Sequence, residues 1–189
     1  MNGMMSLLSA FGLSTAAGLN AYIPLLTIGV LARYTDLITL DAPYDILEHP
    51  VVLLVIAVIA LLDLIGDKIP AVDHTLHAAG VILAPAAGAV LFLAANSDAG
   101  LVHPVFAAIC GVIVAGFAHG ARATARPFVT ATTGGVGNPV VSFLEDVAAL
   151  ILSVLAIILP VLAFLAALAG ILLFLALLRR MRRKPAPAS

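Results

Sequence analysis

The stretch Val147–Leu178 holds 32 residues without a single charged side chain. A run of about 18 or more apolar residues indicates a membrane span, because about 20 helical residues cross the roughly 30 Å hydrocarbon layer. Other apolar runs recur along the chain, and hydrophobic residues make up 63% of its 189 residues. A water-soluble chain of this length could not bury so much apolar surface. The sequence therefore predicts an all-α integral membrane protein.

The apolar runs predict about six transmembrane helices, over residues 6–32, 51–66, 77–95, 104–120, 139–159 and 161–178. The first run carries Gly18, Asn20 and Pro24 near its middle, so it is either continuous or broken there. The last 32-residue run would be about 48 Å long as one helix, which is more than ordinary tilt absorbs. We therefore expect a turn at Pro160 and two spans, and one kinked helix is the alternative.

The chain is predicted to form a single transmembrane domain, residues 1–178, followed by a basic tail, residues 179–189. The distribution of charged residues predicts on which side of the membrane each loop lies. Positively charged residues concentrate on the cytoplasmic side of membrane proteins. If the tail is cytoplasmic, six crossings put Lys68, Arg122 and Arg126 on that side too, and of the nine Lys and Arg residues only Arg33 lies outside. The other side receives acidic residues, namely Asp36, Asp41, Asp45, Glu48 and Asp98. We expect a multi-pass protein of the bacterial inner membrane with both termini cytoplasmic.

An internal repeat relates residues 49–97 to residues 103–151. A shift of 54 residues places His49-Pro50-Val51 on His103-Pro104-Val105, and 11 of the 49 aligned positions are identical. Internal repeats are common in transporters, where binding sites lie at the repeat interface. Each unit contains two predicted spans, so the two copies are expected to be parallel. A duplication without any meaning for transport is the alternative.

Charged residues gather at the predicted cytoplasmic ends of both units, where each needs a partner or a role because charge in a membrane is costly. The first unit contributes Asp67, Lys68, Asp73 and His74, and the second contributes Arg122, Arg126, Glu145 and Asp146. Glu145 and Asp146 lie two turns into a predicted helix. Ion pairs with Lys68, Arg122 or Arg126 would explain them, and a proton or cation relay is the alternative.

The segment before the fifth predicted helix favours an anion site. Asn138 followed by Pro139 is typical of a helix N-cap and first turn. Gly135 and Gly137 would leave backbone N–H groups free to face a ligand at a helix start, and Thr132 and Thr133 precede them. Arg122 and Arg126, four residues apart, would converge on the same anion. The alternative is a plainly capped helix with arginines anchored at the interface.

Three weakened stretches of helix favour a central polar cavity. They are residues 18–24, 80–85 and 134–139, and each combines glycine with proline. Irregular backbone at membrane depth is tolerated only where it is buried in protein or lines a cavity.

The sequence predicts no catalytic residue, metal or cofactor. It contains no Gly-x-Ser-x-Gly arrangement. His74 and His77 lie three residues apart and near Asp73, but the histidines do not form the pattern of three or four ligands that a zinc site usually needs.

Three segments, residues 17–24, 67–74 and 132–146, together resemble a family of bacterial membrane proteins catalogued as domain of unknown function 4126. The resemblance covers nearly the whole chain. It implies a small polytopic inner-membrane protein, and it implies no activity.

The leading interpretation is a small transporter or carrier with a cytoplasm-facing polar site for an anionic or phosphate-bearing solute or lipid. The candidate ligand-binding residues are Asn20, Asp67, Lys68, Asp73, His74, Arg122, Arg126, Thr132, Thr133, Gly135, Gly137, Asn138, Glu145 and Asp146. A non-catalytic scaffold or accessory subunit with structural charge clusters is the alternative, and an enzyme acting on lipid headgroups is a third. Expected partners are membrane lipids and a small anionic ligand, not nucleic acid, and homo-oligomers are compatible with the sequence.

Overall fold

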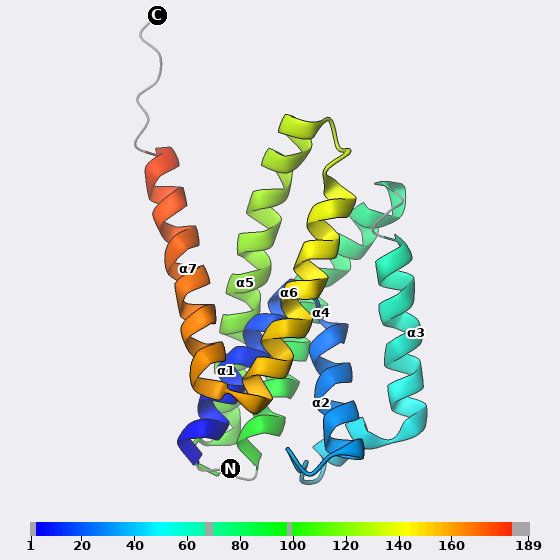
Figure 1. Cartoon of the computed structure of the whole chain (residues 1–189), viewed down its shortest axis with the longest axis vertical. Helices are drawn as coiled ribbons and strands as arrows, with labels where there is room; N and C mark the ends of the chain where they lie inside the picture. The colour runs from blue at the N-terminus through cyan, green and yellow to red at the C-terminus, as the bar shows by residue number, and fades with distance from the viewer. Residues whose placement is uncertain (1–2, 67–69, 98–99, 183–189) are drawn as a thin grey trace, which may run out of the picture.

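The described part of the chain is built from helices. The computed structural model describes residues 3–66, 70–97 and 100–182, with side chains for all of these except 70–78 and 181–182. In these ranges the elements are α1 (Gly3–Leu19), α2 (Tyr22–Tyr34), the 3-10 turn η1 (Tyr44–Glu48), α3 (Pro50–Gly66), α4 (Pro70–Ser97), α5 (Pro104–Thr133), α6 (Asn138–Ile158) and α7 (Pro160–Arg182) (Figure 1). Four of them, α4 to α7, are long and apolar enough to cross a membrane, and α1 to α3 are shorter apolar helices. The protein is an all-α, multi-pass membrane protein, as predicted.

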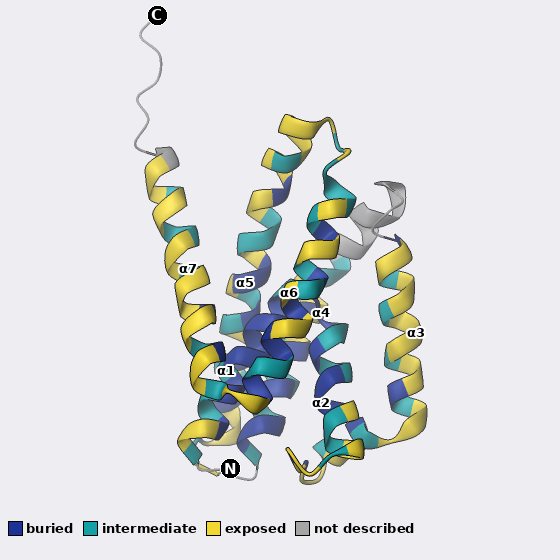
Figure 2. Ribbon diagram, in the orientation of Figure 1, coloured by how far each residue is buried: buried dark blue, intermediate teal, exposed yellow. Residues whose placement is uncertain are grey.

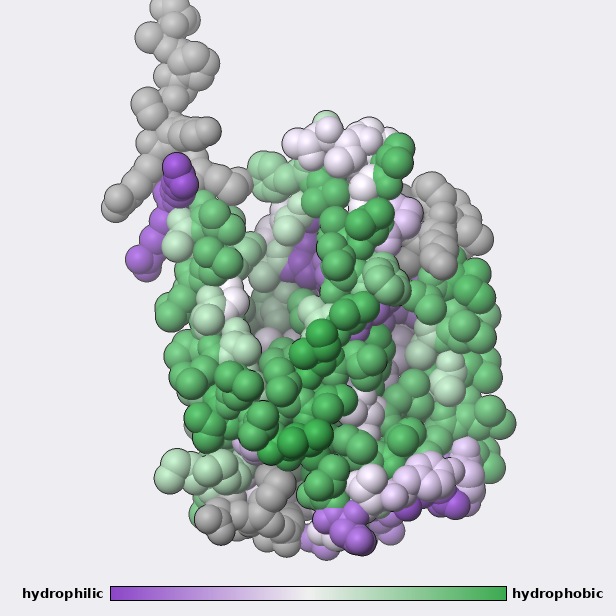
Figure 3. All heavy atoms as spheres, in the orientation of Figure 1, coloured by the Kyte–Doolittle hydropathy of each residue, from purple (hydrophilic) through white to green (hydrophobic). Residues whose placement is uncertain are grey.

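The bundle has two polar ends and an apolar middle. We call one the acidic end: it holds the start of α1, the end of α4, the start of α5, and the α2–α3 loop with Asp36, Asp41 and Asp45 (Figure 1). The opposite, basic end holds the α5–α6 turn and the last turns of α7, which carry Arg179 and Arg180. A broad band of hydrophobic side chains lies between the two ends (Figure 3). The bundle axis therefore runs across the membrane, with lipid around the band.

The first predicted helix, residues 6–32, is two helices that fold back on each other. α1 rises from the acidic end into the bundle, the chain turns at Asn20 and Ala21, and α2 returns to the acidic end (Figure 1). At 1.5 Å per residue, α1 is about 26 Å long and α2 about 20 Å, whereas the hydrocarbon layer is about 30 Å thick. This α1–α2 hairpin ends inside the bundle and is not a span.

The start of α1 and the end of α7 lie at opposite ends of the bundle, whereas the sequence predicts six crossings with both termini on one side (Figure 1). α1 begins at the acidic end, where Ser6 lines a cavity together with Asp36 and Ala94, and α7 ends at the basic end (Figure 1). The hairpin starts and finishes at the same end of the bundle, and α3 to α7 then alternate in direction between the two ends (Figure 1). A break in an apolar run does not reveal whether the chain continues across the membrane or turns back, and the side of the membrane on which each terminus lies stays a prediction.

α1 lies at the centre of the bundle, and ten of its 17 residues are buried (Figure 2). It packs against α4, α5, α6 and α7. Small residues permit these close contacts: Gly18 lies against Ala118, and Gly88 of α4 faces Gly111 of α5, with no room for a side chain at any of the three glycines. The Ser14 hydroxyl donates to the carbonyl of Gly88 at 2.9 Å. Small residues and interhelical hydrogen bonds commonly hold membrane helices together.

The expected turn at Pro160 is confirmed, because α6 ends at Ile158 and α7 begins at Pro160. The expected break at residues 80–85 is wrong: α4 continues through Pro85. Proline inside a membrane helix is tolerated when its surroundings satisfy the backbone groups it frees, and Gly80 lets α4 pack on the imidazole ring of His119. α5 also continues past its predicted end at residue 120 to Thr133, so that Arg122 and Arg126 lie on a helix.

Each predicted repeat unit forms one helix that rises toward the basic end and one that descends: α3 and α4, then α5 and α6 (Figure 1). Their starts match, because the Nδ1 atoms of His49 and His103 accept from the N–H groups of Val51 and Val105, both at 3.3 Å. α5 passes the matching Gly120 without interruption, and residues 67–69, which follow Gly66 in the first unit, lie outside the described residues. The common duplication stays a prediction.

Candidate polar site at the tip of the helical hairpin

Asn20 forms the tip of the α1–α2 hairpin and is 5% exposed. Its side-chain Oδ1 accepts from the backbone N–H groups of Tyr22 and Ile23, at 2.9 and 3.2 Å. The first N–H groups of a helix have no partner within the helix, and asparagine is among the residues that best satisfy them. The local sequence therefore dictates the break: α1 ends at Leu19, and the Asn20 side chain binds the first N–H groups of α2, which begins at Tyr22.

The amide nitrogen of Asn20 connects the hairpin to two other helices. It donates to Oδ1 of Asp146 on α6 at 2.9 Å and to Oδ2 of Asp63 on α3 at 3.3 Å. The amide carries two hydrogens and can serve both carboxylates at once. One side chain therefore joins the tip of the hairpin to α3 and α6.

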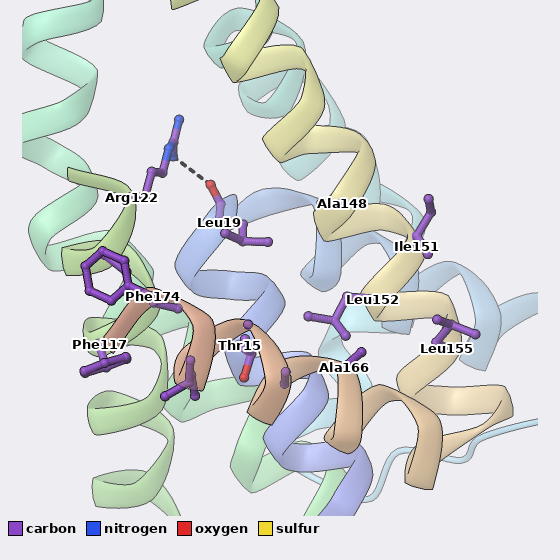
Figure 4. Close-up of a pocket in the computed structure, with 15 residues that line it drawn as sticks. Thr15, Leu19, Phe117, Arg122, Ala148, Ile151, Leu152, Leu155, Ala166 and Phe174 are labelled. Atoms are coloured by element: carbon purple, nitrogen blue, oxygen red, sulfur yellow. Dashed lines mark hydrogen bonds between the residues drawn. The ribbon is translucent and has the colours of Figure 1, made fainter. Parts of the chain in front are cut away.

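Arg122 on α5 reaches the same tip from the other side. Its Nη1 donates to the backbone carbonyl of Leu19 at 2.7 Å (Figure 4). Leu19 is the last residue of α1, where carbonyls lack helical partners and the helix dipole is negative. A cation is the appropriate partner for this helix end.

A single carboxylate joins Arg122 to Arg126. Oε2 of Glu145 on α6 accepts from Nε of Arg122 at 2.6 Å and from Nη2 of Arg126 at 3.0 Å. These side chains are only 9–14% exposed, and Arg126 also donates to the Ser142 hydroxyl at 3.3 Å. The predicted ion pairing of Glu145 with Arg122 and Arg126 is confirmed. We call Asn20, Asp63, Arg122, Arg126, Ser142, Glu145 and Asp146 the tip cluster.

A small polar cavity and two apolar grooves adjoin the tip cluster. The polar cavity, about 30 Å³, is lined by Asn20, Tyr22, Asp63, His119 and Arg122, among others, and is large enough for ordered water. Both grooves border α6, and Figure 3 shows hydrophilic atoms at the bottom of recesses on either side of that helix.

The first groove, which we call the arginine groove, has a volume of about 460 Å³ and lies between α1, α5, α6 and α7 (Figure 4). Its described lining is apolar except for Thr15 and Arg122. The second groove, of about 420 Å³, lies between α2, α3 and α6, with Asn20 and Asp146 in its lining. The two grooves therefore reach the tip cluster at a cation and at a carboxylate, respectively.

The predicted anion cradle before α6 is not supported by the turn that the structure shows there. The N–H groups of Gly134 and Gly135 donate to the carbonyl of Thr130, and that of Gly137 donates to the Thr133 hydroxyl. These donors close the turn itself. Asn138 is the first residue of α6, not its N-cap, and its side chain bonds with the Thr130 hydroxyl at 3.0–3.1 Å.

The structure thus brings together five of the predicted site residues: Asn20, Arg122, Arg126, Glu145 and Asp146. Thr132, Thr133, Gly135, Gly137 and Asn138 lie apart from them, in the α5–α6 turn and the helix ends beside it. Asp67 and Lys68 lie outside the described residues, and Asp73 and His74 lie in α4 where only the backbone is described.

Sequence reasoning left Asp63 and Ser142 out of the candidate residues. Asp63 had a usable signal, since a lone carboxylate in the apolar run 51–66 needs a partner. Ser142 had none, because serine is common in membrane helices. Among the described residues, no three His, Cys, Asp or Glu side chains are grouped so as to hold a metal ion.

A comparison with known protein families assigns the chain to one of them. Residues 7–180 match the family described as domain of unknown function (DUF4126). The chain belongs to this family. No curated protein and no solved structure matches it. Because the family's description carries no activity, the function of this DUF4126 member has to be inferred from the tip cluster and its surroundings.

Proposed function

We propose that this DUF4126 protein is a small carrier of the plasma membrane, with its tip cluster as the site for an anionic or phosphate-bearing solute or lipid. The α1–α2 hairpin is the observation that carries the proposal: two helices meet at Asn20 inside the bundle and not at a surface. Helix ends inside a membrane protein occur where the backbone is buried or lines a cavity. In many carriers such ends bind the cargo and the coupling ion.

The position of the tip cluster supports binding from the cytoplasmic side. Arg122 and Arg126 lie on the part of α5 nearer the basic end, which also carries Arg179 and Arg180. The positive-inside tendency assigns that end to the cytoplasm. The two grooves beside α6 give the cluster lateral contact with lipid.

One observation favours the alternative of a non-transporting scaffold or accessory subunit. Glu145 engages both guanidinium groups, at 2.6 and 3.0 Å, and so ties α5 to α6. A charge cluster that only locks helices together would have this geometry. A carrier and a scaffold differ in whether the cluster moves cargo, and that difference can be measured.

The test is transport by the purified protein in phosphatidylcholine vesicles. Movement of a fluorescently labelled phosphatidylglycerol between leaflets is followed by dithionite quenching, and entry of radiolabelled phosphate and succinate is followed in parallel. We expect the wild type to accelerate at least one of these anionic cargoes. Asn20→Ala should abolish that movement, because it removes the α2 cap and the links to Asp63 and Asp146.

Asn96→Ala is the matched control. Asn96 is as buried as Asn20, at 4% against 5%, but its amide donates to the carbonyl of Val102 near the acidic end. Transport by this variant should be retained. A folded wild type that moves none of the three cargoes would contradict the carrier proposal and leave the scaffold as the better account.

A further inference from the structure

We infer that the arginine groove is a binding site for an anionic lipid, whose acyl chain occupies the groove and whose headgroup faces Arg122. This inference rests on the proposed function and narrows its cargo from anions in general to an amphiphile. It follows from the shape of the groove, the chemistry of its lining and the medium it faces.

The groove has the size and the apolar lining of a ligand site. Its volume of about 460 Å³ falls within the roughly 300–1,000 Å³ that is usual for small-molecule pockets. Figure 4 shows Phe117 and Phe174 close together on one side and Leu152, Leu155 and Ala166 on another. The two phenyl rings meet edge to face with their centroids 6.2 Å apart. Such walls suit a hydrocarbon chain.

Arg122 sets the charge of the headgroup. It is the one charged residue among the described residues that line the groove. The hydroxyl of Thr15, the other polar lining residue, donates to its own helix at the carbonyl of Phe11. A guanidinium at the end of an apolar groove is complementary to a phosphate or carboxylate headgroup. Arg122 already pairs with Glu145 at 2.6 Å and with the Leu19 carbonyl at 2.7 Å, so an anionic headgroup would share this guanidinium with them. A cation at the end of the groove favours an anionic amphiphile over a neutral one.

The membrane supplies the ligand. Ile151 of α6, which lines the groove, and Leu172 of α7 are 54% and 57% exposed, and a broad band of hydrophobic side chains surrounds the middle of the bundle (Figure 3). An acyl chain can therefore enter the groove sideways, without crossing water. A water-soluble phosphate would leave the apolar part of the groove unfilled.

Gly170 on α7 allows the groove to be filled selectively. It lines the groove, and a side chain added there would meet open space. Gly120 on α5 is likewise exposed and helical with open space beside it, but it does not line either groove. Gly170→Leu and Gly120→Leu are thus a matched pair, and neither touches the tip cluster.

The experiment is photo-crosslinking in phosphatidylcholine vesicles with a phosphatidylglycerol that carries a diazirine in its acyl chain. Adducts are mapped by peptide mass spectrometry. We expect labelling of α6 and α7 at groove residues, suppressed by unlabelled phosphatidylglycerol but not by added phosphatidylcholine or inorganic phosphate. Gly170→Leu should lower this labelling roughly tenfold, which corresponds to about 1.4 kcal/mol, and Gly120→Leu should leave it unchanged.

Three outcomes would overturn the inference: equal competition by phosphatidylcholine, competition by inorganic phosphate alone, or unchanged labelling in Gly170→Leu. The result is separable from that of the vesicle transport assay. Labelling that meets every criterion in a protein that transports nothing would retain the lipid site and reject the carrier. Transport of phosphate without groove labelling would retain the carrier and reject the lipid site.

Discussion

Glu145 is the residue on which the charge balance of the tip cluster depends. One of its oxygens accepts from both Arg122 and Arg126, and all three side chains are nearly buried. Its removal leaves two guanidinium groups without this carboxylate. An ion pair broken from one side is strongly destabilising in a low-dielectric setting, because desolvation of the remaining charge is no longer offset.

We therefore expect Glu145→Gln to lower the free energy of unfolding by about 3–5 kcal/mol. Glu48→Gln is the control: the same change at a partly exposed position near the acidic end should stay within about 0.5 kcal/mol. Reversible unfolding in mixed micelles measures both. Equal effects of the two substitutions would show that the Glu145 ion pairs contribute nothing to stability.

The residue scale also shows where sequence reasoning succeeds. Ion pairs between Glu145 and the two arginines were predictable, since charges on adjacent apolar helices require partners. The links from Asn20 to Asp63 and Asp146 were not, because they span 43 and 126 residues of sequence. Such distant contacts depend on how the helices are arranged, and composition and spacing do not encode that arrangement.

At the scale of elements, the α5–α6 turn bonds within itself, and the α1–α2 hairpin bonds to other helices. Both contain glycine, proline and asparagine, so the sequence does not distinguish them. Hydrogen bonding does: the N–H groups of the turn are used within it, whereas Asn20 also bonds to two other helices. The apolar runs predicted where helices form. The 32-residue length of the last run predicted the turn at Pro160, because one helix of that length is too long for the membrane.

The turn predicts a backbone effect. Gly135 has φ = 89°, a conformation that L-residues with a Cβ adopt only with strain of about 1–3 kcal/mol. Gly135→Ala should therefore lower the free energy of unfolding by about 1–3 kcal/mol, without altering anion or lipid binding. Gly120→Ala, in a regular helix with open space around it, should be neutral or stabilising by up to about 1 kcal/mol. Thermal unfolding tests both, and loss of anion binding in Gly135→Ala would reinstate the turn as a ligand site.

At the scale of the whole molecule, the hairpin places the start of α1 and the end of α7 at opposite ends of the bundle (Figure 1). The start of α1 joins the acidic α2–α3 loop at one end, and the α5–α6 turn joins the end of α7 at the other (Figure 1). The positive-inside tendency predicts that the loop after α2 and the loop after α5 lie on opposite sides, and the structure places them at opposite ends of the bundle (Figure 1). The tendency could not place the amino-terminal end, because that end depends on whether the first apolar run crosses the membrane.

Cysteine labelling in cells tests this sidedness, starting from a Cys110→Ala background. Met4→Cys and Asp41→Cys should both react with an impermeant maleimide from outside. Val136→Cys, at a position 81% exposed in the α5–α6 turn, should react only after permeabilisation. If Met4→Cys instead behaves like Val136→Cys, six crossings are restored and the hairpin is rejected.

The central position of α1 has a consequence for biogenesis. α1 precedes α4, α5, α6 and α7 in the chain, yet it is packed among all four. During synthesis it emerges before any of these partners, with buried Ser6, Ser9 and Ser14 still uncovered. Its final packing therefore has to follow insertion of α7, so a helix made before all four of its partners is among the last to reach its native environment. Truncation near Pro160 would remove α7, against which α1 packs. The truncated protein would then expose α1 and be recognised by membrane quality control.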